Sequence, residues 1–373
     1  MYEFFPGNYR WSYNTLLSLC AGGQVGDVAL VHAELKDRVG DDAAWHEAWA
    51  RLARLLEQRA TQAGSARSAA DDWFLASLYH TISEHFIPPA DPARLASYGE
   101  VLRCFERARA SAPFRLDRVE VPFEGGHLPA YWLPVQDGGS AGRPTAIFIC
   151  GLDTTKELWF LRARQAFAER GINALFIDTP GIGEALRYGR LVTRHDYEKP
   201  VGAAIDWLLQ QAEVDARRIG IVGSSLGGYY ISRAAAFEPR LAAAVAWGAI
   251  YDYHAVWVRR TTVGGTLATP FFQLMYITGT DNMPAAMEKV REFRVADFGA
   301  RIHCPYLLMH GADDQQVLLE DAKAMFDVIG SSDKQLKIFT GEDGGSAHCQ
   351  FDNHLPALHL AADWLADKLG AGR

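Results

Sequence analysis

One serine lies in a sequence that could make it a nucleophile. Residues 219–232 read Ile-Gly-Ile-Val-Gly-Ser-Ser-Leu-Gly-Gly-Tyr-Tyr-Ile-Ser, which contains Gly-x-Ser-x-Gly centred on Ser225. A β-branched run precedes the pattern and a helical pattern follows it, which is the strand–turn–helix setting of a nucleophile elbow. The bare pattern arises often by chance, so this setting carries the prediction. Ser224 is the alternative nucleophile, but the register against the two glycines favours Ser225.

A serine hydroxyl needs a general base, and the base needs a carboxylate to orient it. The apolar run 305–310 leads into Gly-Ala-Asp-Asp, which places Asp313 and Asp314 at the C-terminal end of a predicted strand. The next predicted strand, 335–340, leads into a Gly-rich loop that carries His348. Because the order serine, aspartate, histidine is the one expected after an elbow, we predict His348 as the base and Asp314 as its partner. Asp313 is the rival for the acid, and we expect one of the two to cap the following helix.

The tetrahedral intermediate of acyl transfer needs two backbone N–H donors for its oxyanion. One donor is expected from Leu226, directly after the nucleophile, and the other from Leu152, in the loop after the predicted strand 145–150. In the same loop, Thr154-x-x-Glu157 fits a capping box, so we interpret these two residues as a helix start. Cys150 is interpreted as a buried thiol.

The elements that must position these residues fall into two regions. From Gln24 to about Ala112, apolar residues recur at helical spacing, for example Leu95, Tyr98 and Phe105. From Leu116, a β-hairpin is predicted around the turn 124–127. Short apolar runs then alternate with longer amphipathic stretches and predict strands at 145–150, 173–178, 218–223, 242–248, 305–310 and 335–340. Buried strands that alternate with helices predict an α/β fold with a mostly parallel sheet flanked by helices.

The predicted domains are therefore a helical N-terminal region, residues 1–115, and an α/β domain, residues 116–373. The stretch from about 251 to 298 interrupts the alternation of strand and helix and is rich in aromatic residues. We expect it to be an insertion that covers the sheet like a lid. Together with the helical region, it could line an apolar pocket for a flat substrate, although packing explains its aromatic residues at least as well.

Composition excludes several classes of protein. The 373 residues carry 37 Lys and Arg against 45 Asp and Glu, a net charge of −8, which argues against nucleic acid as a partner. The first residues show no basic, apolar leader, and no apolar run is long enough to cross a bilayer, so we expect a cytoplasmic protein without membrane association. The five cysteines are scattered, which argues against a disulfide framework or a zinc site. Because Gly181-Ile-Gly183 is not a full dinucleotide-binding pattern, we expect no cofactor and no metal.

Taken together, the elbow, the His-Gly-x-x-Asp segment and the final histidine loop resemble the α/β-hydrolase superfamily from about Leu116 to Ala371. Three segments are similar to one branch of it, which contains 2,6-dihydroxypseudooxynicotine hydrolase and the fungal heptaketide-shortening hydrolases: 151–157 (Gly-Leu-Asp-Thr-Thr-Lys-Glu), 178–184 (Asp-Thr-Pro-Gly-Ile-Gly-Glu) and 348–353 (His-Cys-Gln-x-Asp-Asn). This resemblance implies hydrolysis of a carbon–carbon bond beside a ketone in an aromatic or polyketide-like substrate. It also implies a helical cap and a homodimer.

Hydrolases of the pseudooxynicotine type also use an acidic residue from the segment after the sixth strand. In this chain that segment reads Tyr251-Asp252-Tyr253-His254, and Asp252 is the nearest candidate. Tyr251 and Trp257 are the other candidates for substrate contact. Two alternatives stay open: a carboxylesterase, thioesterase or acyltransferase with the same three residues, and a non-catalytic binding or regulatory protein on the same scaffold.

Overall fold

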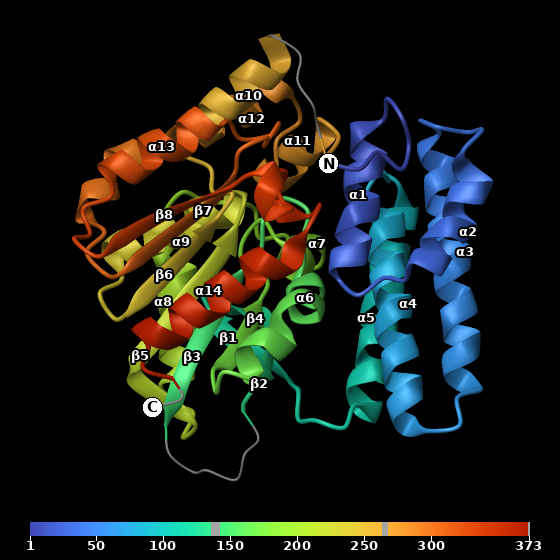
Figure 1. Ribbon diagram of the computed structural model, residues 1–373, viewed down its shortest axis with the longest axis horizontal. Coiled ribbons are helices and arrows are strands. Elements are labelled where there is room, and N and C mark those ends of the chain that lie inside the picture. Colours follow the sequence, from blue (N-terminus) through green and yellow to red (C-terminus); the bar gives the residue numbers. More distant parts are fainter. Residues whose placement is uncertain (136–141, 263–267, 372–373) are drawn as a thin grey trace. The chain divides into compact units, whose positions relative to one another are not determined.

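The computed structural model describes residues 1–135, 142–262 and 268–371 (Figure 1). The chain divides into two compact units. One unit consists of residues 2–115 and 266–273, and the other of residue 1, residues 116–265 and residues 274–373. Residues 263–267 of the expected insertion lie outside the described residues.

The first unit is helical, as its amphipathic spacing predicts. Several of its helices begin at a side chain that accepts a hydrogen bond from an otherwise unpaired amide of the first turn. Asp41 accepts from the amide of Ala44, and Ser65 accepts from the amide of Ser68. The helices are α1 (Tyr9–Cys20), α2 (Val25–Leu35), α3 (Asp42–Thr61), α4 (Ala66–Glu84) and α5 (Pro92–Ser111).

The core of the helical unit lies around α4, which packs against both α3 and α5. Trp45 and Trp49 of α3 are fully buried, and the Trp49 ring lies 5.6 Å from that of Tyr79 in α4. One expected core position is wrong, because Leu95 is 41% exposed. The buried face of α5 instead runs through Arg94, Ser97, Tyr98, Val101, Cys104, Phe105 and Ala108.

The segment 268–273 belongs to the helical unit, although about 150 residues of the chain lie between it and α5. The side-chain amide of Asn14 donates to the carbonyl of Ala268 at 3.1 Å. The Arg94 guanidinium donates to Gln273 Oε1 at 2.8 Å and forms an ion pair with Glu84 at 3.1 Å. Part of the expected insertion is therefore built into the helical unit by hydrogen bonds to buried side chains.

The second unit contains an eight-stranded sheet, in the order β1-β2-β4-β3-β5-β6-β7-β8. The β1–β2 and β2–β4 pairs are antiparallel and the other pairs are parallel, which confirms the mostly parallel sheet. Every strand expected from the apolar runs is present. The strands are β1 (Asp117–Phe123), β2 (Gly126–Leu133), β3 (Arg143–Ile149), β4 (Asn173–Ile177), β5 (Val214–Ser224), β6 (Ala243–Trp247), β7 (Tyr306–Gly311) and β8 (Lys334–Phe339).

Helices cover both faces of this sheet. Figure 1 shows α6 (Lys156–Ala168) and α14 (His354–Lys368) in front of it, and α8 (Glu198–Leu208) and α9 (Leu226–Phe237) behind it. Because both faces are covered, all residues of β4, β6 and β7 are buried. The remaining helices are α7 (Gly183–Arg187), α10 (Tyr253–Thr262), α11 (Phe272–Thr278), α12 (Met283–Lys289) and α13 (Leu319–Val328), with 3₁₀ turns at Val290–Glu292, Val295–Asp297, Gly299–Arg301, Gly341–Asp343 and His348–Gln350.

Across the three described stretches of the chain, no helix is both long enough and apolar enough to cross a membrane.

Candidate active site

Ser225 occupies the sharp turn between β5 and α9. Its backbone has φ 57° and ψ −121°, a left-handed conformation that is costly for a residue with a side chain. Two glycines make the turn possible. A Cβ on Gly223 would lie 2.3 Å from the carbonyl oxygen of Gly227, and a Cβ on Gly227 would lie 2.5 Å from that of Cys150. The turn therefore needs glycine at both positions and holds Ser225 at the C-terminal edge of the sheet.

The structure brings together the three residues that we predicted as nucleophile, base and acid. His348 Nε2 lies 3.0 Å from the hydroxyl oxygen of Ser225. His348 Nδ1 lies 2.6 Å from Asp314 Oδ2. Each residue follows a different strand, since Ser225 follows β5, Asp314 follows β7 and His348 follows β8. The carboxyl ends of parallel strands meet at one edge of the sheet, which explains how distant residues converge there.

Asp314 is held by its own loop. Its Oδ1 accepts the amides of Gln316 at 2.8 Å and Val317 at 2.9 Å, so Oδ2 is left for the histidine. Burial disfavours the charged carboxylate and so raises its pKa. The adjacent His348 opposes this effect through both its charge and its hydrogen bond, and the net result is a pKa of this carboxyl below its ordinary value. The expectation that one of the two aspartates caps the next helix is wrong. The cap position of α13 is Leu318, because the turn that Asp314 closes ends before the helix begins.

His348 is almost fully buried, and burial works against its protonated form. The Asp314 carboxylate contributes the opposite effect through both its charge and its hydrogen bond, and the net result is a raised pKa for His348. A carboxylate that accepts from Nδ1–H also favours the tautomer in which Nε2 can take a proton. The arrangement is that of a general base aimed at a hydroxyl.

The loop that carries His348 has an unusual backbone. Cys349 and Gln350 both have positive φ, 52° and 51°. The conformation is held by Trp247, whose indole N–H donates to Gln350 Oε1 at 2.6 Å. Asp352 accepts the amide of Ser346 just before the histidine at 2.9 Å. Sequence reasoning assigned no role to these supporting residues, although the similar segment 348–353 contains two of them.

His310 at the end of β7 closes the turn that holds the acid. Its Nε2 donates to the carbonyl of Val317 at 3.0 Å and lies 3.6 Å from Asp314 Oδ2. Burial lowers the pKa of His310, although the nearby Asp314 carboxylate opposes this effect.

The loop expected to supply an oxyanion donor lies against the nucleophile. A Cβ on Gly151 would be 3.2 Å from Ser225 Cβ and 3.8 Å from the amide nitrogen of Leu226. Leu226 is the first residue of α9, and the first amides of a helix have no partner within the helix. The next residue after Gly151 is Leu152, so the two predicted donors belong to neighbouring backbone segments.

The predicted capping box in this loop is wrong. The cap position of α6 is Thr155, and its side chain makes no capping hydrogen bond. Thr154 instead accepts the amide of Gly151 at 2.9 Å and so closes the loop on itself. The Glu157 side chain contacts the ammonium group of Lys156.

The three residues predicted to contact substrate have different surroundings. The Asp252 carboxylate accepts the amide of Ala255 at 2.8 Å, in the first turn of α10. It also pairs with Arg294 at 3.2 Å. Tyr251 is half-buried and follows Ile250, whose amide donates to the carbonyl of Ser225 at 3.3 Å. Trp257 of α10 has no exposed surface, which favours packing over substrate contact in this conformation.

One group of described side chains offers three donor atoms of the kind that bind metals. Atoms of Glu57, His80 and Cys104 in the helical unit lie within 4.8 Å of one another. The Glu57 carboxylate is already occupied, because one oxygen contacts His80 Nε2 at 2.8 Å and the other pairs with Arg103. We therefore interpret the group as a buried hydrogen-bond network and assign no metal to it.

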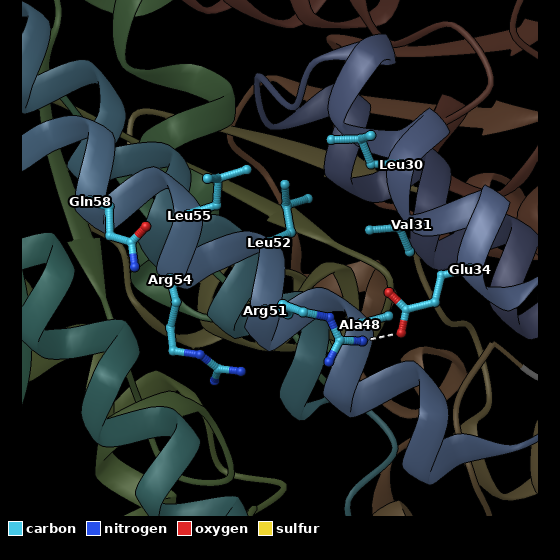
Figure 2. A pocket seen from close by; sticks show the side chains of 9 residues that line it. All are labelled: Leu30, Val31, Glu34, Ala48, Arg51, Leu52, Arg54, Leu55 and Gln58. Carbon is cyan, nitrogen blue, oxygen red and sulfur yellow. Dashed lines mark hydrogen bonds and ion pairs between the residues drawn. The ribbon is translucent and has the colours of Figure 1, made fainter.

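The helical unit also has a groove of about 390 Å³ between α2 and α3. Figure 2 shows an ion pair between Arg51 and Glu34, two of the residues that line it. The groove is lined mainly by aliphatic side chains and contains no serine, cysteine or histidine, so we assign no chemistry to it. The lining residues are Leu30, Val31, Glu34, Ala48, Arg51, Leu52, Arg54, Leu55 and Gln58.

The sheet topology and the serine elbow define an α/β-hydrolase. The family model of esterase FrsA-like proteins matches residues 25–261, and that of the prolyl oligopeptidase family matches residues 160–372. The chain therefore belongs to the FrsA-like esterases and, through the sheet unit, to the prolyl oligopeptidase family.

The chain is similar over most of its length to several hydrolases. It is 27% identical to Hydrolase LUC6 of Fusarium sp, over 100% of this chain and 99% of that protein. It is 28% identical to 2,6-dihydropseudooxynicotine hydrolase of Paenarthrobacter nicotinovorans, over 89% of this chain and 86% of that protein. A crystal structure of the 2,6-dihydroxy-pseudo-oxynicotine hydrolase matches with a TM-score of 0.82 at 26% identity and covers 96% of each chain. These findings confirm the resemblance inferred from the motifs.

Proposed function

We propose that this hydrolase uses Ser225 as a nucleophile to cleave a carbon–carbon bond beside a ketone, in an aromatic or polyketide-like small molecule. The observation that carries the serine mechanism is the pair of hydrogen bonds at His348, which accepts from the Ser225 hydroxyl at 3.0 Å and donates to Asp314 at 2.6 Å. The substrate class rests on similarity to hydrolases that include one named for 2,6-dihydropseudooxynicotine.

The first half of the reaction forms an acyl-enzyme. His348 Nε2 takes the proton of the Ser225 hydroxyl as Oγ bonds to the substrate carbonyl carbon. The carbonyl oxygen becomes an oxyanion, which accepts from the N–H groups of Leu226 and Leu152. The bond between the carbonyl carbon and its neighbour then breaks. The electron pair leaves as an enolate or an electron-rich aryl carbon, which takes the proton from His348.

The second half returns the enzyme to its resting state. His348 takes a proton from a water molecule whose oxygen attacks the acyl carbon. The tetrahedral intermediate collapses, the Ser225 ester bond breaks, and the serine recovers its proton from His348. A carboxylic acid is released. Asp314 stabilises the imidazolium in both halves and does not itself take the proton.

A second candidate function is a carboxylesterase, thioesterase or acyltransferase. The match to a family described as esterase FrsA-like favours it. The same residues would then expel an alcohol or a thiol, and an acyltransferase would use an acceptor other than water. A non-catalytic role would leave the three hydrogen-bonded residues and the strained turn unexplained.

The experiment compares an aryl 1,3-diketone with the matching aryl ester as substrates. Values of kcat/KM are measured by mass spectrometry of the products, with Ser225→Ala as the blank. Preferential cleavage of the diketone supports the carbon–carbon hydrolase, whereas turnover of the ester alone supports the second candidate. Labelling by a fluorophosphonate that is absent in Ser225→Ala would reject the non-catalytic alternative.

The proposal includes a homodimer in the cytoplasm, and the dimer rests on the family resemblance. Light scattering on the eluting peak of a sizing column measures the mass directly. Twice the mass of the chain is the expected result, and a mass equal to that of one chain would reject the dimer.

A further inference from the structure

Two of the sequence segments that resemble the hydrolase branch meet in a buried ion network. The ammonium group of Lys156, in the segment 151–157, lies 2.9 Å from Asp178 Oδ2 and 2.9 Å from Glu184 Oε2, both in the segment 178–184. It also lies 2.7 Å from Glu157 Oε1. The side chains of Lys156 and Asp178 have no exposed surface. Neither the nucleophile nor its base takes part in this network.

Asp178 joins the beginnings of two helices. Its Oδ1 accepts the amide of Lys156, the first residue of α6, at 2.9 Å. Its Oδ2 accepts the amide of Glu184, at the start of α7, at 2.8 Å. Gly183 has φ 45°, and a Cβ there would lie 2.1 Å from the same carboxylate oxygen. The carboxylate therefore packs directly on the backbone of α7 and fixes the start of α6 to the end of β4.

The cations of the network lie against carboxylates, which offsets part of the cost of burying charge. Lys156 and Arg118 are the cations, and Arg118 pairs with Glu184 at 2.5 Å. Asp178 and Glu184 are the matching anions. Glu157 is a third acidic side chain beside Lys156, and burial raises the pKa of its carboxyl. Removal of Lys156 would leave two carboxylates without their shared cation.

The network lies at the far end of the loop that reaches the nucleophile. The loop begins at Gly151, beside Ser225, and ends at Lys156. Thr154 closes its first part by accepting the amide of Gly151 at 2.9 Å. Leu152 therefore lies within the turn that the Gly151–Thr154 hydrogen bond closes, and the contacts of Lys156 with Asp178 fix the residue at which the loop ends.

We propose that Thr154, Lys156 and Asp178 are positioning residues that hold the loop amide of Leu152 where the oxyanion of the reaction forms. This inference rests on the proposed serine mechanism. An oxyanion donor acts mainly in the transition state, so its displacement lowers kcat more than it raises KM. Loss of one such donor costs about 100-fold to 1,000-fold in kcat.

The test uses Lys156→Met and Thr154→Val, with Thr154→Ser as the conservative variant that keeps the hydroxyl. Lys334→Met is the control, because it also removes a lysine whose ammonium group is hydrogen-bonded. Lys334 is half-buried and donates to the carbonyls of Phe326 and Ile329 at the start of β8, away from the loop 151–156. For each folded variant, kcat, KM and two inhibition constants are measured. One inhibitor is an aryl trifluoromethyl ketone, which forms a tetrahedral adduct with a serine, and the other is the matching unreactive aryl alcohol.

The expected result for Lys156→Met and Thr154→Val is a fall in kcat/KM of about 100-fold and an equal loss of affinity for the trifluoromethyl ketone. The affinity for the alcohol stays within about twofold, because the ground-state pocket is unchanged. Thr154→Ser recovers most of the loss, and Lys334→Met shows none of it. Equal losses for both inhibitors, or no loss in Thr154→Val, would overturn the inference.

Lys156→Met removes a buried charge and could fail to fold. Thr154→Val keeps the side-chain volume and the net charge. If Lys156→Met does not fold, the result for Thr154→Val decides the test. Failure of the serine mechanism gives a different result, since the parent enzyme would then form no adduct with a fluorophosphonate or with the trifluoromethyl ketone. If the parent enzyme forms the adduct but the variants lose affinity equally for the ketone and the alcohol, only the positioning role is rejected.

Discussion

The imidazole of His348 lies 3.0 Å from the hydroxyl oxygen of Ser225, although the two residues are 123 positions apart in the chain. The contact forms because both residues follow strands of one largely parallel sheet. It depends on positive φ angles in two turns. One is at Ser225 itself, and the others are at Cys349 and Gln350, directly after the histidine. Both turns are held by the interior of the sheet unit.

Replacement of Ser225 by alanine is expected to lower kcat by about 10⁴-fold to 10⁶-fold, because it removes the hydroxyl that lies 3.0 Å from His348 Nε2. Alanine keeps the same Cβ, so the fold should be retained. Steady-state kinetics and circular dichroism check this, with Ser224→Ala as the control. Near-normal turnover in a folded Ser225→Ala variant would reject the nucleophile.

The pH dependence of kcat/KM should report His348. The base works only when neutral, and Asp314 raises its pKa above the ordinary 6.5, so activity falls as the pH drops through this raised value. The midpoint of the acidic limb is therefore expected above pH 6.5.

Asp314→Asn removes the charge that raises this pKa. The midpoint should move down, and kcat should fall by about 10⁴-fold because the tautomer is no longer held. Rate profiles from pH 5 to 10 measure both effects. A midpoint that is the same in parent and variant would show that another group controls the acidic limb.

Gly227→Ala should prevent the nucleophile turn from closing. The added methyl would lie 2.5 Å from the carbonyl of Cys150, and backbone atoms cannot move aside cheaply. We expect a lower Tm, with a cost of at least about 1–3 kcal/mol, and little remaining activity. Gly26→Ala is the control, since its Cβ would meet nothing within 4 Å. Normal Tm and activity in Gly227→Ala would contradict the described turn.

Arg94→Met should destabilise the helical unit. Arg94 and Glu84 are an ion pair with 2% and 0% exposed side chains, so the substitution removes a cation from beside a buried carboxylate. The expected cost is about 3–5 kcal/mol in the free energy of unfolding. Urea denaturation measures it, and Arg94→Met combined with Glu84→Gln should recover part of the loss. An additive, larger loss in the double variant would show that the pair is not coupled.

Trp257→Ala distinguishes packing from substrate contact. The buried side chain packs against Tyr253, with ring centroids 6.1 Å apart, and beneath the guanidinium of Arg260. We expect a loss of about 3–5 kcal/mol in stability and an unchanged order of preference among substrates. A change in preference at constant Tm would instead place this residue in the substrate pocket.

The amino-acid sequence alone determined the order of the elements and the identity of the candidate triad. Apolar runs bounded by glycine and charged residues mark strands such as 306–311, and the two glycines around Ser225 mark the turn, because these preferences are local. The sequence also favoured Asp314 over Asp313 as the acid, and in the structure Asp314 is the residue hydrogen-bonded to His348.

Tertiary structure decided what depends on contacts between distant segments. Sequence periodicity placed Leu95 in the core, but the packing of α5 buries Arg94 instead. The capping-box prediction at Thr154 is wrong because its hydroxyl accepts the amide of Gly151, and the amide of Lys156 at the start of α6 donates instead to the Asp178 carboxylate. The segments 151–157 and 178–184 join into one ion network only when β3 and β4 pair. A buried charge is stable only when its partners are assembled around it, and no local preference encodes that assembly.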